Sequence, residues 1–382
     1  MVNYEYPPLG GGGGVFNRHL AEALTGHLQV TVLTTRMDDL PVEEESGGVR
    51  IVRVPVLQRT EQPVASLASM LSFFPSSLRR GLRLLGEEQY DVVHSMFAVP
   101  SAVSGILLAR RAGVPHVLSL LGGDVYDPTK RLSPHRTPGL FHTVRTMVRR
   151  SDRVVAMSND IRERLKGLYG IDRQVDLVPH GISLQPAPPR PREDFGFRAG
   201  EMVLITVGRL IPRKGLDDLI RIVAGLEEPG LILALIGGGP LRHELEDLAR
   251  AHGIQDRVRF FGYVDEDTKW QLLQAADIYV STALHEGFGL VFLEAMGVSL
   301  PIVCYDEGGQ VDFLADGESA YVVRLGDTGV FADRLRRLVR DPALRSRMGK
   351  AGMHAVEDYD IECCARRFLQ IYEEAIRART MS

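Results

Sequence analysis

The chain of 382 residues contains only three cysteines, and none is placed to form a recognisable framework. Cys363 and Cys364 are adjacent and Cys304 lies in an apolar run, so neither a set of disulfides nor a paired C-x-x-C metal site is expected. The first residues also lack the positive start and the apolar stretch of a secretory signal peptide. These absences predict a protein of the reducing cytoplasm.

The sequence has little net charge and no uninterrupted apolar run of membrane-spanning length. Its 45 Lys and Arg against 49 Asp and Glu give a net charge of −4. This balance argues against a nucleic-acid partner, because binding to a phosphate backbone normally rests on excess positive charge. Residues 62–78 and 92–109 carry no acidic or basic side chain, but each falls short of the roughly 20 apolar residues that a spanning helix needs. The length predicts about two domains.

Short β-branched runs alternate with helical periodicity along nearly the whole chain, which is typical of parallel sheets built from β-α-β units. The alternation is interrupted once, at residues 182–192, where four prolines disfavour both helix and central strand. An extended linker is therefore predicted there. We expect an α/β protein of two Rossmann-like, doubly wound domains, with ligands bound in a cleft between the carboxyl ends of both sheets.

A run of five glycines, residues 10–14, precedes an amphipathic helix predicted to start at Phe16. Backbone N–H groups at such a helix start suit a phosphate, because no side chain blocks its approach. A flexible connector is the alternative. The run is neither a Walker A loop nor a dinucleotide fingerprint. Only residues 1–3 are left for the strand that should precede it, so this strand is either very short or incomplete in this sequence.

Arg209 and Lys214 lie in a turn between a predicted strand, residues 202–207, and a helix predicted to start near Leu216. Such a turn would hold both cations at the carboxyl end of the second sheet. There they can neutralise a diphosphate without a metal ion. A solvated surface turn is the alternative, but the position directly after a strand favours a functional role.

The most informative segment, residues 281–296, contains two glutamates. In one continuous helix Glu286 and Glu294 would stand about 12 Å apart and about 80° around the axis, too far to hold one small group. The two glycines between them instead predict that Glu286 lies in a loop. The first turn of the following helix would then carry the N–H groups of Gly289, Leu290 and Val291.

Glu294 can accept hydrogen bonds from the paired hydroxyls of a ribose, as the acidic residue of a dinucleotide site does, while Glu286 would face the transferred group. The neighbours of Glu294 are apolar, so its carboxylate would be partly buried and would need a partner. A glutamate that only complements the helix dipole is the alternative. The string Asp265-Glu266-Asp267 precedes another predicted helix and is interpreted as a helix cap and not as a metal site.

In their order and spacing these segments resemble the retaining family 4 glycosyltransferases of the GT-B fold, over nearly the entire chain. The strings Val178-Pro179-His180-Gly181 and Gly237-Gly238-Gly239-Pro240 belong to the same pattern. The resemblance implies an acceptor-side domain at 1–181, a linker at 182–200 and a donor domain at 201–355. It also implies that a C-terminal helix, within 356–382, crosses back to the first domain.

The resemblance further implies roles for individual residues. Asp124, Glu286, Arg209 and Lys214 would act in catalysis. Many relatives carry His and Gly near the position of Asp124; here Asp124 would lie on the sugar side, with a helix N-cap as the alternative. Tyr263 and Val264 would lie against the base. The implied donor site comprises Gly13, Gly14, Arg209, Lys214, Tyr263, Val264, Glu286, Gly287, Phe288, Gly289, Leu290, Val291 and Glu294.

The implied activity is transfer of a hexosyl group with retention of configuration, in polysaccharide biosynthesis, without a metal or other cofactor. The donor would be a UDP- or GDP-sugar, and the acceptor a hydroxyl of a glycan, a lipid-linked or a small molecule. The departing phosphate oxygen would itself accept the acceptor's proton. A sugar-nucleotide epimerase of the same fold remains an alternative.

A non-catalytic protein that binds a nucleotide sugar or a membrane surface is a second alternative. Leu67, Met70, Leu71, Phe73 and Phe74 are followed by Arg79, Arg80 and Arg83, and such a segment could rest on the inner face of an anionic membrane. A solvated helix pair is the plainer interpretation. Peripheral membrane contact is therefore left open.

Overall fold

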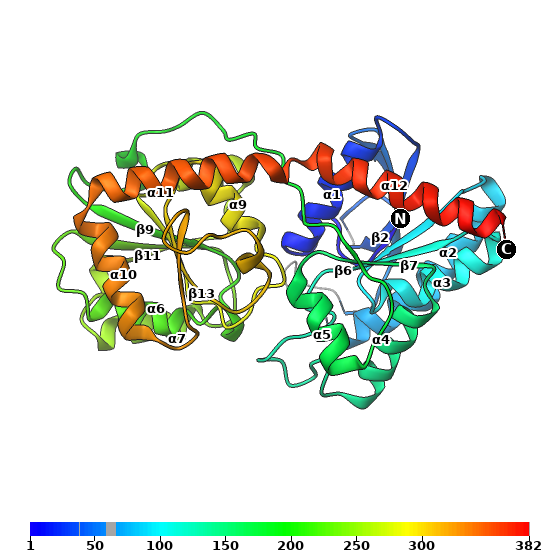
Figure 1. Cartoon of the computed structure of the whole chain (residues 1–382), viewed down its shortest axis with the longest axis horizontal. Helices are drawn as coiled ribbons and strands as arrows, with labels where there is room; N and C mark the ends of the chain where they lie inside the picture. The colour runs from blue at the N-terminus through cyan, green and yellow to red at the C-terminus, as the bar shows by residue number, and fades with distance from the viewer. Residues whose placement is uncertain (38, 59–65, 382) are drawn as a thin grey trace. The chain divides into compact units, whose positions relative to one another are not determined.

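The computed structural model describes residues 1–37, 39–58 and 66–381, and it divides the chain into two compact units. Unit 1 consists of Met1–Ser183 together with Asp360–Ser382, and unit 2 consists of Leu184–Tyr359. Each unit is a sheet with helices packed on its faces (Figure 1). The chain leaves unit 1 at the proline-rich segment and returns to it for the last helix, α12 (Ile361–Thr380).

The sheet of unit 1 has eight strands in the order β3-β4-β2-β1-β5-β6-β7-β8. All neighbouring strands are parallel except β3 and β4. The predicted first strand is present: β1 comprises two residues of this sequence and pairs with both β2 and β5. The strands are β1 (Val2–Asn3), β2 (Val30–Arg36), β3 (Glu43–Ser46), β4 (Val49–Pro55), β5 (Val93–Met96), β6 (His116–Leu120), β7 (Arg153–Ala156) and β8 (Asp176–Leu177).

Helices cover both faces of this sheet, as successive residues of β5 illustrate. Val93 packs in an apolar cluster with Phe73 and Leu108 from two helices, whereas His94 contacts Phe368 and Tyr372 of α12 on the opposite face. The helices of unit 1 besides α12 are α1 (Gly12–Leu24), α2 (Leu67–Glu87), α3 (Ser101–Ala112), α4 (Pro138–Arg150) and α5 (Asn159–Tyr169). Within the described residues no helix has the length and apolar character needed to cross a bilayer; residues 62–65 of one uncharged segment lie outside them.

The sheet of unit 2 has six parallel strands in the order β11-β10-β9-β12-β13-β14. Numbered from the first strand of the unit, this is 3-2-1-4-5-6, the doubly wound order whose direction reverses between β9 and β12. Ligands of such sheets bind outside the carboxyl ends of the strands at that reversal. The strands are β9 (Met202–Val207), β10 (Leu231–Ile236), β11 (Val258–Gly262), β12 (Ile278–Ser281), β13 (Ile302–Tyr305) and β14 (Ala320–Val323).

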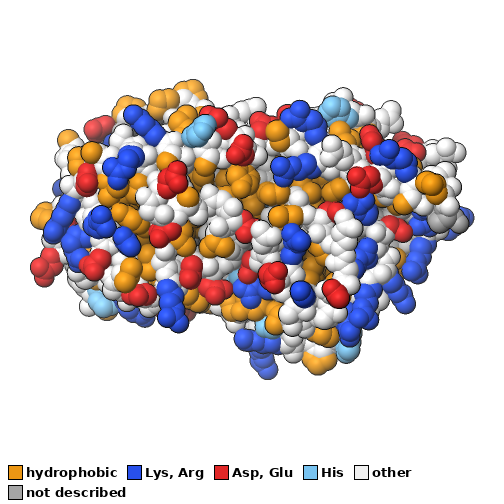
Figure 2. All heavy atoms as spheres, viewed as in Figure 1, with side chains coloured by type: hydrophobic (Ala, Val, Ile, Leu, Met, Phe, Trp, Pro, Cys, Tyr) orange, Lys and Arg blue, Asp and Glu red, His pale blue; other side chains and the backbone are white. Residues whose placement is uncertain are grey.

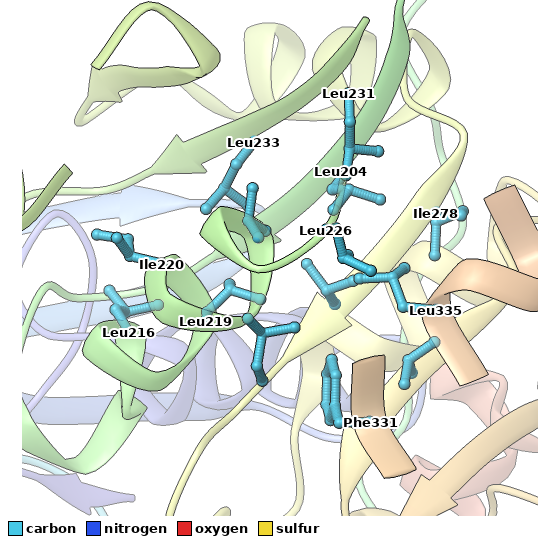
Figure 3. Close-up of a cluster of buried hydrophobic side chains, with 14 of the residues drawn as sticks. Leu204, Leu216, Leu219, Ile220, Leu226, Leu231, Leu233, Ile278, Phe331 and Leu335 are labelled. Carbon is cyan, nitrogen blue, oxygen red and sulfur yellow. The ribbon is translucent and has the colours of Figure 1, made fainter. Parts of the chain in front are cut away.

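One face of this sheet packs on a leucine-rich cluster in which Leu219 of α6 and Phe331 of α10 meet the strand residues (Figure 3). On the other face Tyr279 contacts Phe292 of α9, with ring centroids 5.3 Å apart. The helices are α6 (Leu216–Ala224), α7 (Arg242–Ala251), α8 (Glu266–Gln274), α9 (Leu290–Gly297), α10 (Thr328–Arg340) and α11 (Pro342–Ala355). Short 3-10 turns are η1 (Arg192–Phe195), η2 (Pro212–Lys214), η3 (Gln255–Arg257), η4 (Gly309–Asp312) and η5 (Val356–Tyr359).

Candidate active site

The loops that follow β9 and β12 flank the reversal point of the unit 2 sheet and are bonded to each other. The N–H of Leu284 donates to the carbonyl oxygen of Arg213 at 2.8 Å. The hydroxyl of Thr282 donates to the carbonyl oxygen of Gly215, also at 2.8 Å. The two segments singled out in the sequence are therefore held together at the edge where a ligand is expected.

Lys214 and Glu286 form a direct ion pair across these loops, between Nζ and Oε1. Their side chains are only 16% and 8% exposed. Burial acts to raise the pKa of Glu286, but Lys214 and Arg213 outweigh it and hold the pKa below its usual value. Glu286 is thus ionised at neutral pH, and Lys214, which the sequence assigned to a diphosphate, also serves as its partner.

The backbone of Glu286 is fixed to the loop after β13. Its N–H donates to the carbonyl oxygen of Glu307 at 3.1 Å, and its carbonyl accepts from the N–H of Gly309 at 2.8 Å. Glu286 therefore lies in a loop ahead of a helix, as predicted, and three strands contribute to its position.

Helix α9 begins at Leu290, directly after Gly289, which has φ +92°. A Cβ at Gly289 would stand 2.5 Å from Cδ2 of Phe292, so only glycine fits this turn. The N–H of Phe292 donates to the carbonyl of Gly289 at 2.9 Å. The N–H groups of Leu290 and Val291 also belong to the first turn of α9. Donors in the first turn have no partner within their own helix, so they suit an anion. The predicted helix start is confirmed.

Phe288 anchors the same loop from inside the unit. It is 2% exposed, and its ring centroid lies 5.0 Å from that of Phe313. Gly287 beside it is also buried. The predicted donor contacts of Gly287 and Phe288 stay predictions, and the structure assigns Phe288 a packing role in addition.

Glu294 lies in the second turn of α9 and is 7% exposed. Its Oε1 accepts a hydrogen bond from Nζ of Lys269 at 2.7 Å. Its Oε2 is buried and has no hydrogen-bond partner among the described residues. Burial raises the pKa of Glu294, and Lys269 opposes that rise only in part. The predicted burial and need for a partner are confirmed, but sequence reasoning missed the partner, Lys269.

The remaining predicted donor residues of unit 2 border the same edge of the sheet. Arg209 is half-buried directly after β9. Tyr263 follows β11 with 82% of its surface exposed, and Val264 next to it is half-buried. The placement of Tyr263 and Val264 against a base stays a prediction.

The predicted capping role of the acidic string is confirmed. Asp265 accepts a hydrogen bond from the N–H of Thr268 at 2.7 Å and so caps α8.

In unit 1 the last three residues of the glycine run, residues 12–14, form the first turn of helix α1, and only Gly10 and Gly11 precede it. The helix begins at Gly12, whereas the sequence predicted a start at Phe16. The N–H of Gly14 donates to the carbonyl of Gly11 at 2.9 Å, and a Cβ at Gly13 would stand 3.0 Å from Cζ of Phe97. The absence of side chains lets this first turn pack closely, which offsets the low helix propensity of glycine.

Asp124 ties two loops of unit 1 together. Its Oδ2 accepts from the N–H of Ala98 at 2.8 Å, and its Oδ1 accepts from the N–H of Leu121 at 3.0 Å. Burial raises the pKa of Asp124, although these backbone donors oppose the rise. The N-cap alternative is wrong, because the next helix, α4, begins only at Pro138. Asp124 instead joins the loops that follow β5 and β6.

Charged side chains of both signs are interspersed over the face shown in Figure 2. In the part of the chain that the structure describes, no group of three or more His, Cys, Asp or Glu side chains is arranged to hold a metal ion.

Comparison with known proteins gives the family of the chain. Residues 189–355 match the family model described as Glycosyl transferases group 1, and residues 10–186 match Glycosyltransferase Family 4. The chain is 30% identical to a D-inositol 3-phosphate glycosyltransferase of Nocardiopsis dassonvillei, over 85% of this chain and 80% of the relative. It is 27% identical to a GDP-mannose-dependent alpha-(1-6)-phosphatidylinositol monomannoside mannosyltransferase of Mycolicibacterium smegmatis, over 93% of this chain and 92% of the relative.

Among solved structures, sucrose-phosphate synthase from Thermosynechococcus elongatus matches with a TM-score of 0.86 and 23% identity over 99% of both chains. The two α/β units are those of the GT-B fold. The two family models and the relatives identify the chain as a glycosyltransferase that uses a nucleotide sugar. The chain belongs to glycosyltransferase family 4. The resemblance inferred from the sequence is confirmed.

Proposed function

We propose that this glycosyltransferase moves a hexosyl group, with retention of configuration and without a metal ion, from a nucleoside-diphosphate sugar bound by unit 2. One observation carries the proposal: Glu294 is buried next to Lys269 and keeps Oε2 without a partner among the described residues. A buried acceptor of this kind is costly unless a ligand satisfies it. The hydroxyls of a ribose would do so.

The diphosphate would lie between Arg209, Lys214 and the first turn of α9. Lys214 has three N–H donors, and one of them is directed at Glu286. The others can meet phosphate oxygens together with the amides of residues 289–291, which supports charge neutralisation by the protein alone. Glu286 would contact the transferred sugar.

In the proposed reaction the bond between the anomeric carbon and the β-phosphate oxygen breaks, and the acceptor oxygen bonds to that carbon from the same face. The departing phosphate oxygen takes the proton of the acceptor hydroxyl. Fixed cations and helix amides stabilise the charge that develops on the phosphate. Asp124 would border the transferred sugar, and Gly13 and Gly14 would approach the diphosphate. The acceptor would be a hydroxyl of a glycan, a lipid-linked or a small molecule.

The donor can be identified by ligand-induced thermal stabilisation with UDP-, GDP- and ADP-sugars. A ligand present at 100 times its dissociation constant adds about 2.7 kcal/mol of stability. Glu294→Gln should remove the stabilisation by the preferred compound. Glu244→Gln, at an exposed position of α7, is the matched control and should keep it. Unchanged stabilisation in the Glu294 variant would reject the ribose assignment.

Product analysis tests the reaction itself. The anomeric proton coupling in the NMR spectrum of the product should show the configuration of the donor sugar, and turnover should survive EDTA. An inverted product or loss of turnover in EDTA contradicts the proposed mechanism. Release of an altered nucleotide sugar without any acceptor would instead indicate the epimerase alternative.

Helix α2 supports a further proposal, peripheral contact with an anionic membrane. Leu67 and Leu71 are 54% and 67% exposed one helical turn apart, and Arg79 and Arg83 on the same helix are exposed as well. Arg80 is not available, because it pairs with Glu43 and Glu87. Co-sedimentation with vesicles containing phosphatidylglycerol should fall in Leu71→Glu and at high salt. Equal binding to vesicles of phosphatidylcholine alone would contradict attraction by charge.

A further inference from the structure

Lys269 is a buried lysine held between two carboxylates. It is 9% exposed, and its Nζ donates to Oε1 of Glu294 at 2.7 Å and to Oε2 of Glu266 at 2.8 Å. A buried ammonium is strongly unfavourable unless it is paired. Glu266 lies one turn before Lys269 on α8, so α8 supplies both the cation and a second anchor for it.

This arrangement fixes the orientation of the Glu294 carboxylate. With Oε1 bonded to Lys269, the other oxygen, Oε2, is the one left without a partner among the described residues. Both helices are held by the packed interior of unit 2, since Trp270 and Leu273 of α8 and Leu293 of α9 are buried. The free oxygen therefore has one defined direction before any ligand arrives.

We propose that Lys269 is the positioning residue for nucleotide recognition: by occupying Oε1 it presents Oε2 of Glu294 as the acceptor for a ribose hydroxyl. This inference rests on the proposed function, which places the ribose at Glu294. Lys269 itself touches neither the sugar nor the phosphates and is not a catalytic residue.

The charge of Lys269 has a second effect on the same carboxyl. Burial and the nearby Glu266 both raise the pKa of Glu294, and Lys269 is the group that lowers it. Tyr279 of β12 is a buried phenol near Glu294, with its own pKa raised by burial and by the nearby glutamates. On the remaining side α11 packs against α9 with Gly352 beside Met296. Without Lys269, a higher pH would be needed to keep Glu294 ionised.

The test compares Lys269→Met and Lys269→Arg with the control Lys350→Met, which changes an exposed lysine of the same unit. The probes are UDP, GDP and ADP and their 2′- and 3′-deoxy counterparts. Lys269→Met should weaken binding of the ribonucleotide by about tenfold, roughly the effect of losing one hydrogen bond to a charged group. In this variant the ratio of the affinity for the ribonucleotide to the affinity for its deoxy counterpart should fall toward one. Lys269→Arg should retain most of both.

Two further readouts separate positioning from a structural role. In Lys269→Met the donor KM should rise while kcat at saturating donor stays within about twofold of wild type. Affinity of Lys269→Met should also decline more steeply than that of the wild type as the pH is lowered, because Lys269 is the group that lowers the pKa of Glu294 and its removal raises that pKa further. A pH-independent loss shared by ribo- and deoxyribonucleotides would overturn the proposal.

The double variant Lys269→Met/Glu294→Gln keeps the result interpretable. If Lys269 acts through Glu294, adding Lys269→Met to Glu294→Gln should cause no further loss of nucleotide binding. If nucleotide binding is lost in Glu294→Gln but kept in Lys269→Met, this inference alone is overturned. If nucleotide binding is unchanged in Glu294→Gln, the proposed function is overturned. Should Lys269→Met fail to fold, Lys269→Gln replaces the ammonium by a neutral donor and should show the same pH dependence.

Discussion

The candidate site of unit 2 and the histidine networks of unit 1 differ in the polar groups that they bury. In unit 2 the buried groups at the candidate site are charged and paired, Lys214 with Glu286 and Lys269 with Glu294. In unit 1 buried histidines have neutral partners. His94 contacts the hydroxyls of Tyr372 and Ser119 at 2.6 and 2.8 Å, and His116 contacts those of Ser151 and Ser95.

The difference shows where each unit uses its polar side chains. Burying a charge is strongly unfavourable unless it is paired, and unit 2 retains such charges where a charged ligand is proposed to bind. The neutral networks of unit 1 join elements of its fold, since Tyr372 belongs to α12 and Ser119 to β6. Changes in unit 2 should therefore affect activity first, and changes in the neutral networks should affect stability first.

The largest effect is expected from Lys214→Met. It removes a cation from the proposed diphosphate site, for which a loss of at least about 100-fold in kcat is typical. It also leaves Glu286 as a buried unpaired carboxylate, at a cost of about 3–5 kcal/mol in the free energy of unfolding. Steady-state kinetics and urea unfolding measure the two effects. Lys214→Met/Glu286→Gln should recover stability without recovering activity; recovery of both would contradict a role in transfer.

The buried histidines of unit 1 predict that stability falls in mild acid. Burial lowers the pKa of His116 and of His180 from 6.5 to about 3 and lowers the pKa of His94 as well. Below about pH 6.5 the unfolded chain binds protons that the folded chain does not, so each group destabilises by up to about 1.4 kcal/mol per pH unit until its folded pKa is reached. Urea unfolding between pH 7.5 and about 5 measures this slope.

A pair of variants assigns that slope to unit 1. His116→Asn should reduce it, whereas His243→Asn should leave it unchanged, because the side chain of His243 in unit 2 is 93% exposed. Equal slopes in all three proteins would contradict the assignment to buried histidines.

Asp124→Asn tests the link between two loops of unit 1. The amide of asparagine has one acceptor oxygen where the carboxylate has two, and its NH₂ group would face a backbone N–H donor. One of the two backbone hydrogen bonds is therefore lost. A cost of about 1–3 kcal/mol in unfolding free energy is expected, together with reduced turnover if the loops border the sugar. Asp172→Asn changes an exposed aspartate of the same unit and serves as the control. Unchanged stability would show that the two backbone contacts contribute little.

Tyr263→Ala should have the smallest effect on stability, within about 0.5 kcal/mol, because the ring is largely exposed. If the ring stacks on the donor base, which is worth about 1–3 kcal/mol, the donor KM should rise at least about fivefold. Tyr263→Phe should preserve affinity. An unchanged KM in the alanine variant would remove Tyr263 from the donor site.

Features set by local sequence could be predicted well. The strand runs gave the two-sheet class, and the glycines around Glu286 gave the loop and the start of α9, because turn geometry depends on residues close in the chain. Lys269 could not be found this way. Beside Glu266 it resembles an ordinary exposed pair on a helix, and only the packing of α8 near α9, 25 residues later, buries it against Glu294.

The helix-cap alternative for Asp124 and the predicted start of the first helix at Phe16 were wrong for a related reason. The local sequence around Asp124 suits a helix cap, but its partner Ala98 lies 26 residues earlier. Likewise the glycines would be poor helix formers in isolation, and the contact of Gly13 with Phe97 depends on a neighbouring loop of the sheet. Both errors arise where distant segments determine the local conformation.

Unit 1 is assembled from two separate stretches of the chain, whereas unit 2 is continuous. During translation, all of unit 2 has therefore been synthesised before Phe368, Ile371 and Tyr372 of α12 exist to cover their part of unit 1. Until the ribosome reaches the final helix, that apolar face stays uncovered, and the earlier-made half of the enzyme is the last to be completed.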